Sequence, residues 1–423
     1  MSHSKSNLTQ DPSSSRDALL QRFQKVQNTT ETLCGHLPPE DHMLQCHQDT
    51  SPLKWHLGHT AWFFERFILE MLLDKTPVHP QYNKVFNSYY ESQGTPFTRS
   101  LRGDISRPTL DKVHAYRQEI QRHISDALQS KAVDDEVLYR VLLGINHEEQ
   151  HQELMLMDLK FNLHINPLGP VYQDDIAKTH NASIPLTWTH VDGLETSLGH
   201  NDAHSSHKFS FDHEGPKHLR RLESFKWASR HVTNKEWREF IEDGGYTNPR
   251  LWLSDGWSHI NANKIDAPLY WKRSGDDWLR FCLKGWVPLE EEAPVCHVSL
   301  YEADAFATWC GKRLPTEFEW EHMANQAKVK GNFLESQKLC PESGDDVFGN
   351  LWTLTGSPFI SYPGYKNNPN ALGEYNGKFM IGQNVLRGGS CFTPTDHIRA
   401  SYRNFFYPHH RWAMQGLRLA DNH

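Results

Sequence analysis

The spacing of apolar residues changes abruptly part-way along this chain of 423 residues. Up to about residue 162, apolar residues recur every three or four positions, which is the spacing along one face of an α-helix. The pattern stops at Asn166-Pro167-Leu168-Gly169-Pro170, and from about Ile184 onward short apolar runs lie among Gly, Trp, Asn and Pro. A chain of this length is also too long for one ordinary compact core. We therefore expect two domains of different structural class.

The first half is expected to be helical. Its four segments of helical periodicity are Arg16 to Leu33, Ser51 to Leu73, Thr109 to Leu128 and Asp134 to Lys160. Ser51-Pro52 is a start signal, because Ser caps helices and Pro is tolerated at the first helical position. Long helices with short or moderate connections favour an up-and-down four-helix bundle, and the core of such a bundle commonly holds metal sites.

The second half is expected to be an α+β domain. It mixes short strands and long loops with two helical segments, Asn234 to Glu242 after Thr233, and Ser299 to Trp309. The organisation that we expect is a disordered leader over residues 1–15, a helical bundle over 16–162, a linker over 163–183 and the α+β domain over 184–423.

Composition argues against several classes of protein. With 37% hydrophobic and 23% charged residues, the chain has the balance of a soluble globular protein. Its net charge of −8 argues against nucleic-acid binding, which needs a basic face. Met1 to Ser15 is polar, so we expect no signal peptide, and no run is apolar enough to span a membrane. The seven cysteines include no CxxC pair, and their odd count favours reduced thiols in a cytoplasmic protein.

Two histidines lie four positions apart in the last expected helix. His147 and His151 share one helix face, so both imidazoles can bind one iron, copper, nickel or zinc ion. The alternative is a solvated polar face, because chance pairs are common in a chain with 27 histidines. His59 lies among aromatic residues of the second helix and is the candidate third ligand, with a hydrogen-bonded core histidine as the alternative. Three neutral imidazoles leave coordination positions open for substrate and O2, but the spacing does not choose iron over zinc.

The loop between the second and third helices carries further candidates. Tyr89 and Tyr90 are adjacent, and either hydroxyl could donate a proton to an oxygen intermediate at the metal, unless both are packing residues. Arg99 and Arg102 follow, and an arginine here could hold a substrate carboxylate through two parallel hydrogen bonds.

Several strings of the second half resemble the formylglycine-generating, or sulfatase-modifying, family, whose fold is a variant of the C-type lectin fold. They are Phe211-Asp212-His213-Glu214-Gly215-Pro216, Arg313-Leu314-Pro315-Thr316-Glu317, Phe348-Gly349-Asn350-Leu351-Trp352 and Leu386-Arg387-Gly388-Gly389-Ser390. The first half resembles the DinB-like bundle, with His59, His147 and His151 at the positions of its metal ligands. Together the two halves resemble the sulfoxide synthases of ergothioneine biosynthesis, which are non-heme Fe(II) enzymes.

This resemblance implies roles for individual residues. It implies Fe2+ as the cofactor, and hercynine, cysteine or a related thiol, and O2 as the substrates. Gln150 matches a residue that contacts the imidazole of hercynine, and Asn404 matches one that lines its trimethylammonium end. Phe405 could add an aromatic face there, because ring quadrupoles hold quaternary ammonium groups, although plain packing is the alternative.

The resemblance also bears on the sulfur donor. Enzymes of the mycobacterial type use γ-glutamylcysteine and have an aspartate and, four residues later, an arginine where this chain has Phe406 and His410, with Arg411 adjacent. A phenylalanine cannot bind the α-ammonium group of a glutamyl moiety. The adjacent tyrosines resemble instead the types that use free cysteine, so we expect cysteine as the donor, with Tyr90 preferred over Tyr89 beside the metal.

Other functions stay open at this stage. The residues do not exclude a selenoneine synthase, which joins hercynine to a selenosugar, or a synthase that uses γ-glutamylcysteine. An ovothiol synthase usually carries an additional methyltransferase domain. From a different class, the chain could be a non-catalytic protein that binds a thiol or a metal.

Overall fold

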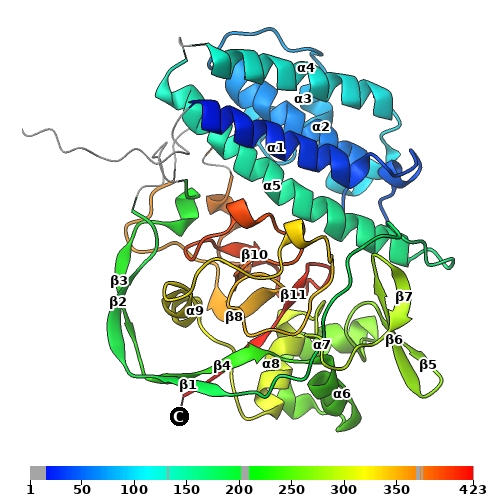
Figure 1. Cartoon of the computed structure of the whole chain (residues 1–423), viewed down its shortest axis with the longest axis vertical. Helices are drawn as coiled ribbons and strands as arrows, with labels where there is room; N and C mark the ends of the chain where they lie inside the picture. Colours follow the sequence, from blue (N-terminus) through cyan, green and yellow to red (C-terminus); the bar gives the residue numbers. More distant parts are fainter. Residues whose placement is uncertain (1–15, 131–132, 202–208, 368–371, 373–374, 423) are drawn as a thin grey trace, which may run out of the picture.

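The computed structural model describes residues 16–130, 133–201, 209–367, 372 and 375–422, so the leader expected over residues 1–15 lies outside it. The first half is a helical bundle, as expected (Figure 1). Its long helices are α1 (Arg16–Cys34), α2 (Leu53–Phe64), α4 (Leu110–Gln129) and α5 (Asp135–His164), and the short α3 (Tyr82–Phe86) follows α2. Both α1 and α2 pack against α4 and α5.

Two details of the second helix differ from the expectation. Pro52, not Ser51, is the N-cap of α2, and the Ser51 hydroxyl instead accepts a hydrogen bond from Arg102 Nη1 at 2.9 Å. The helix also does not run regularly to Leu73, because it widens into a π-helical segment, Glu65–Glu70. The buried Glu65 carboxylate accepts hydrogen bonds there from the Tyr116 hydroxyl and from the Val78 backbone N–H.

The second half is an α+β domain of short strands, which confirms the expected fold class. Strands β1 (Trp188–Val191), β4 (Phe225–His231) and β12 (Arg418–Asp421) form one sheet in the order β1-β4-β12, and β2 (Leu194–Leu198) pairs with β3 (His218–Leu222). A four-stranded sheet has the order β10-β9-β8-β11, from β8 (Trp352–Pro358), β9 (Asn384–Arg387), β10 (Asn404–Phe406) and β11 (Gln415–Gly416). The last sheet consists of β5 (Trp271–Ser274), β6 (Asp277–Cys282) and β7 (Gly285–Pro288).

Capping boxes begin three helices of this domain. Thr233, Ser299 and Thr316 cap α6 (Asn234–Glu242), α8 (Leu300–Trp309) and α9 (Glu317–Ala324), and each accepts from the backbone N–H of a glutamate three residues later. The sequence predicted α6 and α8 but not α9 or α7 (Ser254–Asn263). These helices are eight to ten residues long, so their periodicity is a weak signal.

Helix α5 joins the two domains, and Figure 1 shows it between the bundle and the sheets. The buried Glu153 carboxylate accepts hydrogen bonds from Trp352 Nε1, the Ser390 hydroxyl and the Thr393 hydroxyl at 2.7–2.8 Å. Further along the same helix, Lys160 Nζ lies 2.7 Å from His297 Nε2. Buried residues of both domains form one continuous apolar cluster. Among the described residues, no helix has the length and apolar character needed to cross a membrane.

Candidate active site

Three histidines meet inside the bundle. His59 comes from α2, and His147 and His151 come from adjacent turns of α5. One ring nitrogen of each lies within 4.8 Å of the others, and all three side chains are buried. In the part of the chain that the structure describes, this is the one group of three or more His, Cys, Asp or Glu residues arranged to hold a metal ion. The structure thus brings together the three ligands expected from the sequence.

Hydrogen bonding and burial prepare these rings as neutral ligands. His59 Nδ1 lies 2.6 Å from the carbonyl oxygen of Phe86, which only accepts, so Nδ1 carries the proton and Nε2 presents a lone pair. That Nε2 lies 3.1 Å from His147 Nε2. Burial lowers the pKa of His147 to about 3, and burial, followed by the neighbouring His147, lowers the pKa values of His59 and His151 well below the ordinary value. Three neutral imidazoles around one point fit a divalent transition metal.

A cavity of about 420 Å³ opens beside these histidines. The bundle and the second domain both line it, and its wall includes two of the three ligands, His147 and His151. The other sequence-predicted residues on its wall are Tyr89, Arg99, Arg102, Gln150, Asn404, Phe405 and Phe406. These residues come from α5, from the loop after α3 and from β10, so the cavity exists only where the two domains meet.

Arg102 is a buried cation on the cavity wall. Its side chain is 4% exposed, and its guanidinium stacks 3.4 Å above the Trp55 ring centroid. Among the described residues its Nη1 donates to the Ser51 hydroxyl, its buried Nε has no hydrogen-bond partner, and the nearby acid Asp158 acts on it through charge alone, without a hydrogen bond. Burial, followed by the nearby Arg99, lowers the pKa of this guanidinium well below its ordinary value. An anionic group in the cavity would supply a directly hydrogen-bonded counter-charge.

Aromatic rings line the part of the cavity formed by β10. Phe405 stacks on Phe359 with ring centroids 4.1 Å apart and lies 5.9 Å from Phe379. Asn404, the preceding residue, also lines the cavity. Phe406 lies beside Trp412, with ring centroids 5.7 Å apart. This wall suits an apolar or cationic group better than an anionic one.

The two adjacent tyrosines stack on each other, with ring centroids 4.6 Å apart, but they differ in their access to the cavity. Tyr89 lines the cavity, whereas Tyr90, preferred from the sequence, is fully buried behind it and packs on Phe67 with ring centroids 4.9 Å apart. Arg411 is likewise not brought to the cavity. It forms an ion pair with Glu302 at 3.0 Å and donates a hydrogen bond to the carbonyl oxygen of Ala267. The sequence cannot reveal either orientation, because neighbouring residues in a loop point in directions that only the packed fold decides.

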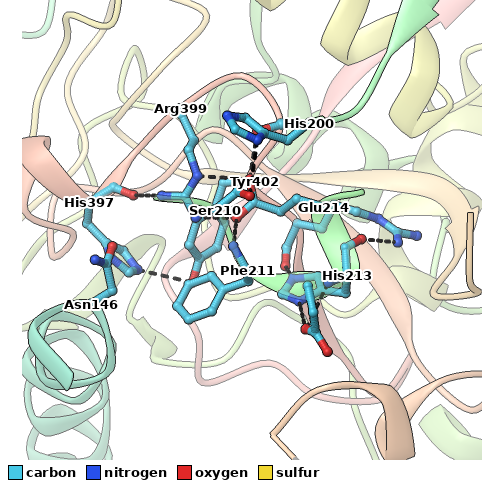
Figure 2. Close-up of polar contacts among 12 residues, drawn as sticks. Asn146, His200, Ser210, Phe211, His213, Glu214, His397, Arg399 and Tyr402 are labelled. Atoms are coloured by element: carbon cyan, nitrogen blue, oxygen red, sulfur yellow. Dashed lines mark hydrogen bonds and ion pairs between the residues drawn. The ribbon is translucent and has the colours of Figure 1, made fainter. Parts of the chain in front are cut away.

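Gln150 is held at both ends of its amide. Its Nε2 donates to the Tyr402 hydroxyl at 2.7 Å, and its Oε1 accepts from the Tyr375 hydroxyl. The Tyr402 hydroxyl in turn lies 3.1 Å from His397 Nε2 (Figure 2). On the other side of the ring, His397 Nδ1 lies 3.3 Å from the Glu149 carboxylate. The tautomer with its proton on Nδ1, the nitrogen nearer the carboxylate, leaves His397 Nε2 free to accept from the Tyr402 hydroxyl. This series of hydrogen bonds orients the Gln150 side-chain amide so that its oxygen faces the Tyr375 hydroxyl.

A second polar network fixes the segment that carries Tyr402. Glu214 accepts hydrogen bonds from Arg399, the Ser401 hydroxyl and the backbone N–H of Phe211 (Figure 2). Arg399 lowers the pKa of the Glu214 carboxyl against the opposing effect of burial, so the group stays charged. Glu214 thus ties residues 399–401, just before Tyr402, to Phe211.

Both halves of the chain match known families. Residues 22–155 match the DinB superfamily, and residues 190–346 match the sulfatase-modifying factor enzyme 1-like domain. A hercynine oxygenase from Mycolicibacterium smegmatis is 31% identical over 406 residues, which cover 88% of this chain and 91% of that protein. The chain belongs to the hercynine oxygenase family.

Other relatives agree with this assignment. A hercynine oxygenase from Mycobacterium tuberculosis is 29% identical over 90% of this chain and 94% of its own length. A formylglycine-generating enzyme from Bos taurus is 28% identical over 39% of this chain and 49% of its own length. The likeness to hercynine oxygenases thus spans both domains, whereas the likeness to the formylglycine-generating enzyme covers less than half of this chain.

The sequence of this hercynine oxygenase family member did not lead us to predict three of its site residues, His56, Tyr375 and Tyr402. His56 lies three positions before His59 on α2, a spacing that was available as a signal. Tyr375 and Tyr402 carried no local signal, because they lie 225 and 252 positions from Gln150 in the chain. Tyr375 lines the cavity with its ring 5.6 Å from that of His147.

Proposed function

We propose that this protein is an Fe(II)- and O2-dependent sulfoxide synthase that joins the sulfur of cysteine to C2 of the hercynine imidazole. The observation that carries the proposal is the group of three neutral histidines at a cavity that also holds a buried arginine, whose Nε has no hydrogen-bond partner among the described residues. In the net reaction, a C–S bond and an S–O bond form, the imidazole C2–H and the thiol S–H are lost, and the other oxygen atom of O2 leaves as water. All seven cysteines are free, which fits a reducing compartment such as the cytoplasm.

His59, His147 and His151 are the proposed iron ligands. Three imidazoles leave positions open, and iron supplies there the reduction of O2 in contact with both substrates. The protein contributes orientation, because both substrates must lie against the metal with the sulfur facing C2.

Arg102 and Arg99 are the proposed anchors for the carboxylate of cysteine. The unpartnered Nε of Arg102 and the planar geometry of its guanidinium suit a carboxylate. Phe406 and His410 line the cavity at the positions where γ-glutamylcysteine users have an aspartate and an arginine, so the α-ammonium group of the glutamyl moiety would meet no acid at position 406.

Gln150, Asn404 and Phe405 are the proposed contacts for hercynine. The amide of Gln150 lies between the two α5 ligands in sequence and faces the cavity, where it can hold the imidazole near the metal. Phe405 presents a ring at the far wall, as a trimethylammonium group requires.

Tyr375 and Tyr89 are the proposed proton donors. Burial raises the pKa of Tyr375 well above its ordinary value, so its hydroxyl stays protonated at neutral pH. Both rings line the cavity, and the Tyr375 ring lies close to that of His147. A proton delivered from the wall favours the sulfoxide over oxidation of the thiol to a sulfinate.

Anaerobic loading with Fe(II), followed by O2, hercynine and one of three donors, tests the proposal. The donors are cysteine, γ-glutamylcysteine and a selenosugar, and mass spectrometry identifies the product. We expect hercynylcysteine sulfoxide as the main product, and turnover with the selenosugar alone would reject the assignment. Phe406→Asp should shift kcat/KM toward γ-glutamylcysteine, whereas Phe406→Leu, which adds no charge, should not.

A further inference from the structure

A chain of polar groups runs away from the metal centre behind His151. His151 Nδ1 lies 2.8 Å from His56 Nδ1, and His56 Nε2 lies 3.0 Å from Asp158 Oδ2. The three side chains are 8%, 2% and 1% exposed, so water competes little for these bonds. His56 has both ring nitrogens occupied, and it is therefore not itself available as a metal ligand.

The direction of each hydrogen bond follows from Asp158. A carboxylate can only accept, so His56 carries its proton on Nε2. A neutral imidazole carries a single proton, so with that proton on Nε2 the Nδ1 of His56 is an acceptor. His151 Nδ1 must then be the donor across the 2.8 Å contact, and the lone pair of His151 is on Nε2.

Asp158 is itself fixed from both domains. Its Oδ2 also accepts from the backbone N–H of Ser51 at 2.8 Å, and its Oδ1 accepts from Trp412 Nε1 at 3.2 Å. Ser51 precedes α2, whereas Trp412 belongs to the second domain and lines the substrate cavity. The carboxylate therefore has little freedom to turn away from His56.

The other two ligands are held differently. His59 donates to a backbone carbonyl, and His147 Nδ1 is buried with no hydrogen-bond partner among the residues that the structure describes. His151 is thus the ligand that is connected, through a neutral imidazole, to a negative charge. Partners of this kind orient a metal-bound imidazole and raise its basicity.

We propose that His56 and Asp158 are positioning residues that hold His151 in the tautomer whose Nε2 binds the metal. The proposal rests on the proposed three-histidine iron site. Asp158 holds the proton on His56 Nε2 and His56 accepts from His151 Nδ1, so His151 keeps its lone pair on Nε2, the nitrogen that would bind the iron.

The test measures metal binding to the full-length apoprotein, separately from turnover. Fe(II) affinity is read from competition with a chromophoric chelator under anaerobic conditions, and the ligand field from the visible spectrum of the Co(II)-loaded protein. We expect His56→Leu and Asp158→Asn to weaken Fe(II) binding by about 10- to 100-fold. His56→Asn keeps an acceptor near the place of Nδ1, so it should recover much of the affinity and the wild-type Co(II) spectrum.

His42→Leu is the matched control. His42 is equally buried in the bundle and its Nδ1 contacts the carbonyl oxygen of Pro38, but it has no contact with the metal ligands. This variant reports the effect of losing a buried imidazole on stability alone, and it should bind Fe(II) normally. Thermal unfolding of each apoprotein shows whether a variant is folded.

The outcomes separate the two levels of the proposal. Wild-type Fe(II) affinity in His151→Ala would remove the metal site and with it the proposed function. Loss of affinity in His151→Ala with unchanged affinity and Co(II) spectrum in His56→Leu and Asp158→Asn would overturn the positioning role alone. Equal loss in His56→Leu and His56→Asn would also overturn it, because the acceptor near Nδ1 would then not matter.

Discussion

At the scale of single residues, Arg102 is a buried positive charge to which no acid among the described residues forms a direct hydrogen bond. Arg102 is held by Ser51 and by the face of Trp55, and neither contact replaces a counter-ion. Such a group lowers the stability of the unliganded fold and is retained where a ligand supplies the opposite charge. Its effects on stability and on substrate binding should therefore have opposite signs.

Replacing Arg102 tests this opposition. Arg102→Met should leave the free energy of unfolding of the apoprotein unchanged or raise it by about 1 kcal/mol, because an uncompensated buried charge is removed. The same change should raise the KM for the thiol at least tenfold, as measured by steady-state O2 consumption. Arg102→Lys keeps the charge without the two-point geometry and should give an intermediate KM. An unchanged KM in the Met variant would contradict the anchor role.

At the scale of elements, α5 explains both the success and the limit of the sequence-based prediction. Its periodicity located the helix and placed His147 and His151 on one face, as the structure has them. The helix is buried almost all round over its second half, because the second domain covers the face that would be solvated in an isolated bundle. No local pattern contains that information. Gln150 was found through its family resemblance, whereas its partners Tyr375 and Tyr402 are fixed by packing across the domains.

Gly58 on α2 controls the support of His59. A Cβ at this position would lie 2.1 Å from Cε1 of Phe86, the residue whose carbonyl oxygen accepts from His59 Nδ1. Gly58→Ala should therefore displace Phe86, reduce the free energy of unfolding by about 1–3 kcal/mol and weaken Fe(II) binding. Chemical denaturation and chelator competition measure the two effects.

Gly256→Ala serves as the comparison. Gly256 lies on α7 of the second domain, and a Cβ at this position would lie 2.8 Å from Cβ of Tyr301 on α8. This variant should also lose stability but keep the wild-type affinity for Fe(II). Equal losses of affinity in the two variants would show that overpacking acts through global stability instead of through His59.

Glu31 makes the contact between α1 and α4 dependent on pH. Although burial raises its pKa, His114 and Arg117 lower it from 4.5 to about 2. The folded state therefore favours the carboxylate, and this stabilisation is present above pH 4.5 and is lost as the pH falls toward about 2. Glu31→Gln should unfold at a lower temperature than the wild type at pH 6, and the difference should shrink below pH 4. A constant difference across this range would exclude the ion pair as its cause.

At the scale of the whole molecule, the two domains share one apolar cluster and the buried polar contacts of Glu153. Calorimetry of the full chain should therefore show one unfolding transition, and Fe(II) bound in the bundle should raise its midpoint for probes in both domains. Trp320 and Trp352 are buried tryptophans of the second domain, and their fluorescence contributes to that domain's signal. Two separate transitions, with only the first shifted by Fe(II), would argue against this coupling.

Glu153→Ala should weaken the junction between the domains. It leaves three donors from the second domain without their acceptor, which should reduce the free energy of unfolding by on the order of 3 kcal/mol. Urea denaturation monitored by circular dichroism measures the change. A loss below about 1 kcal/mol would mean that the apolar contacts alone hold the domains together.

The proposed metal ligands and the proposed donor-pocket residues lie on different elements, and this has a practical consequence for protein engineering. Every proposed metal ligand belongs to α2 or α5, whereas Phe406 and His410 belong to β10 and the loop that follows it. Residues 406–410 can therefore be randomised or exchanged with those of relatives, while the metal ligands, the proposed hercynine contacts Asn404 and Phe405, and Trp412, which binds Asp158, stay untouched. A library confined to this segment would sample new nucleophiles for the imidazole ring in a catalyst that still loads its metal.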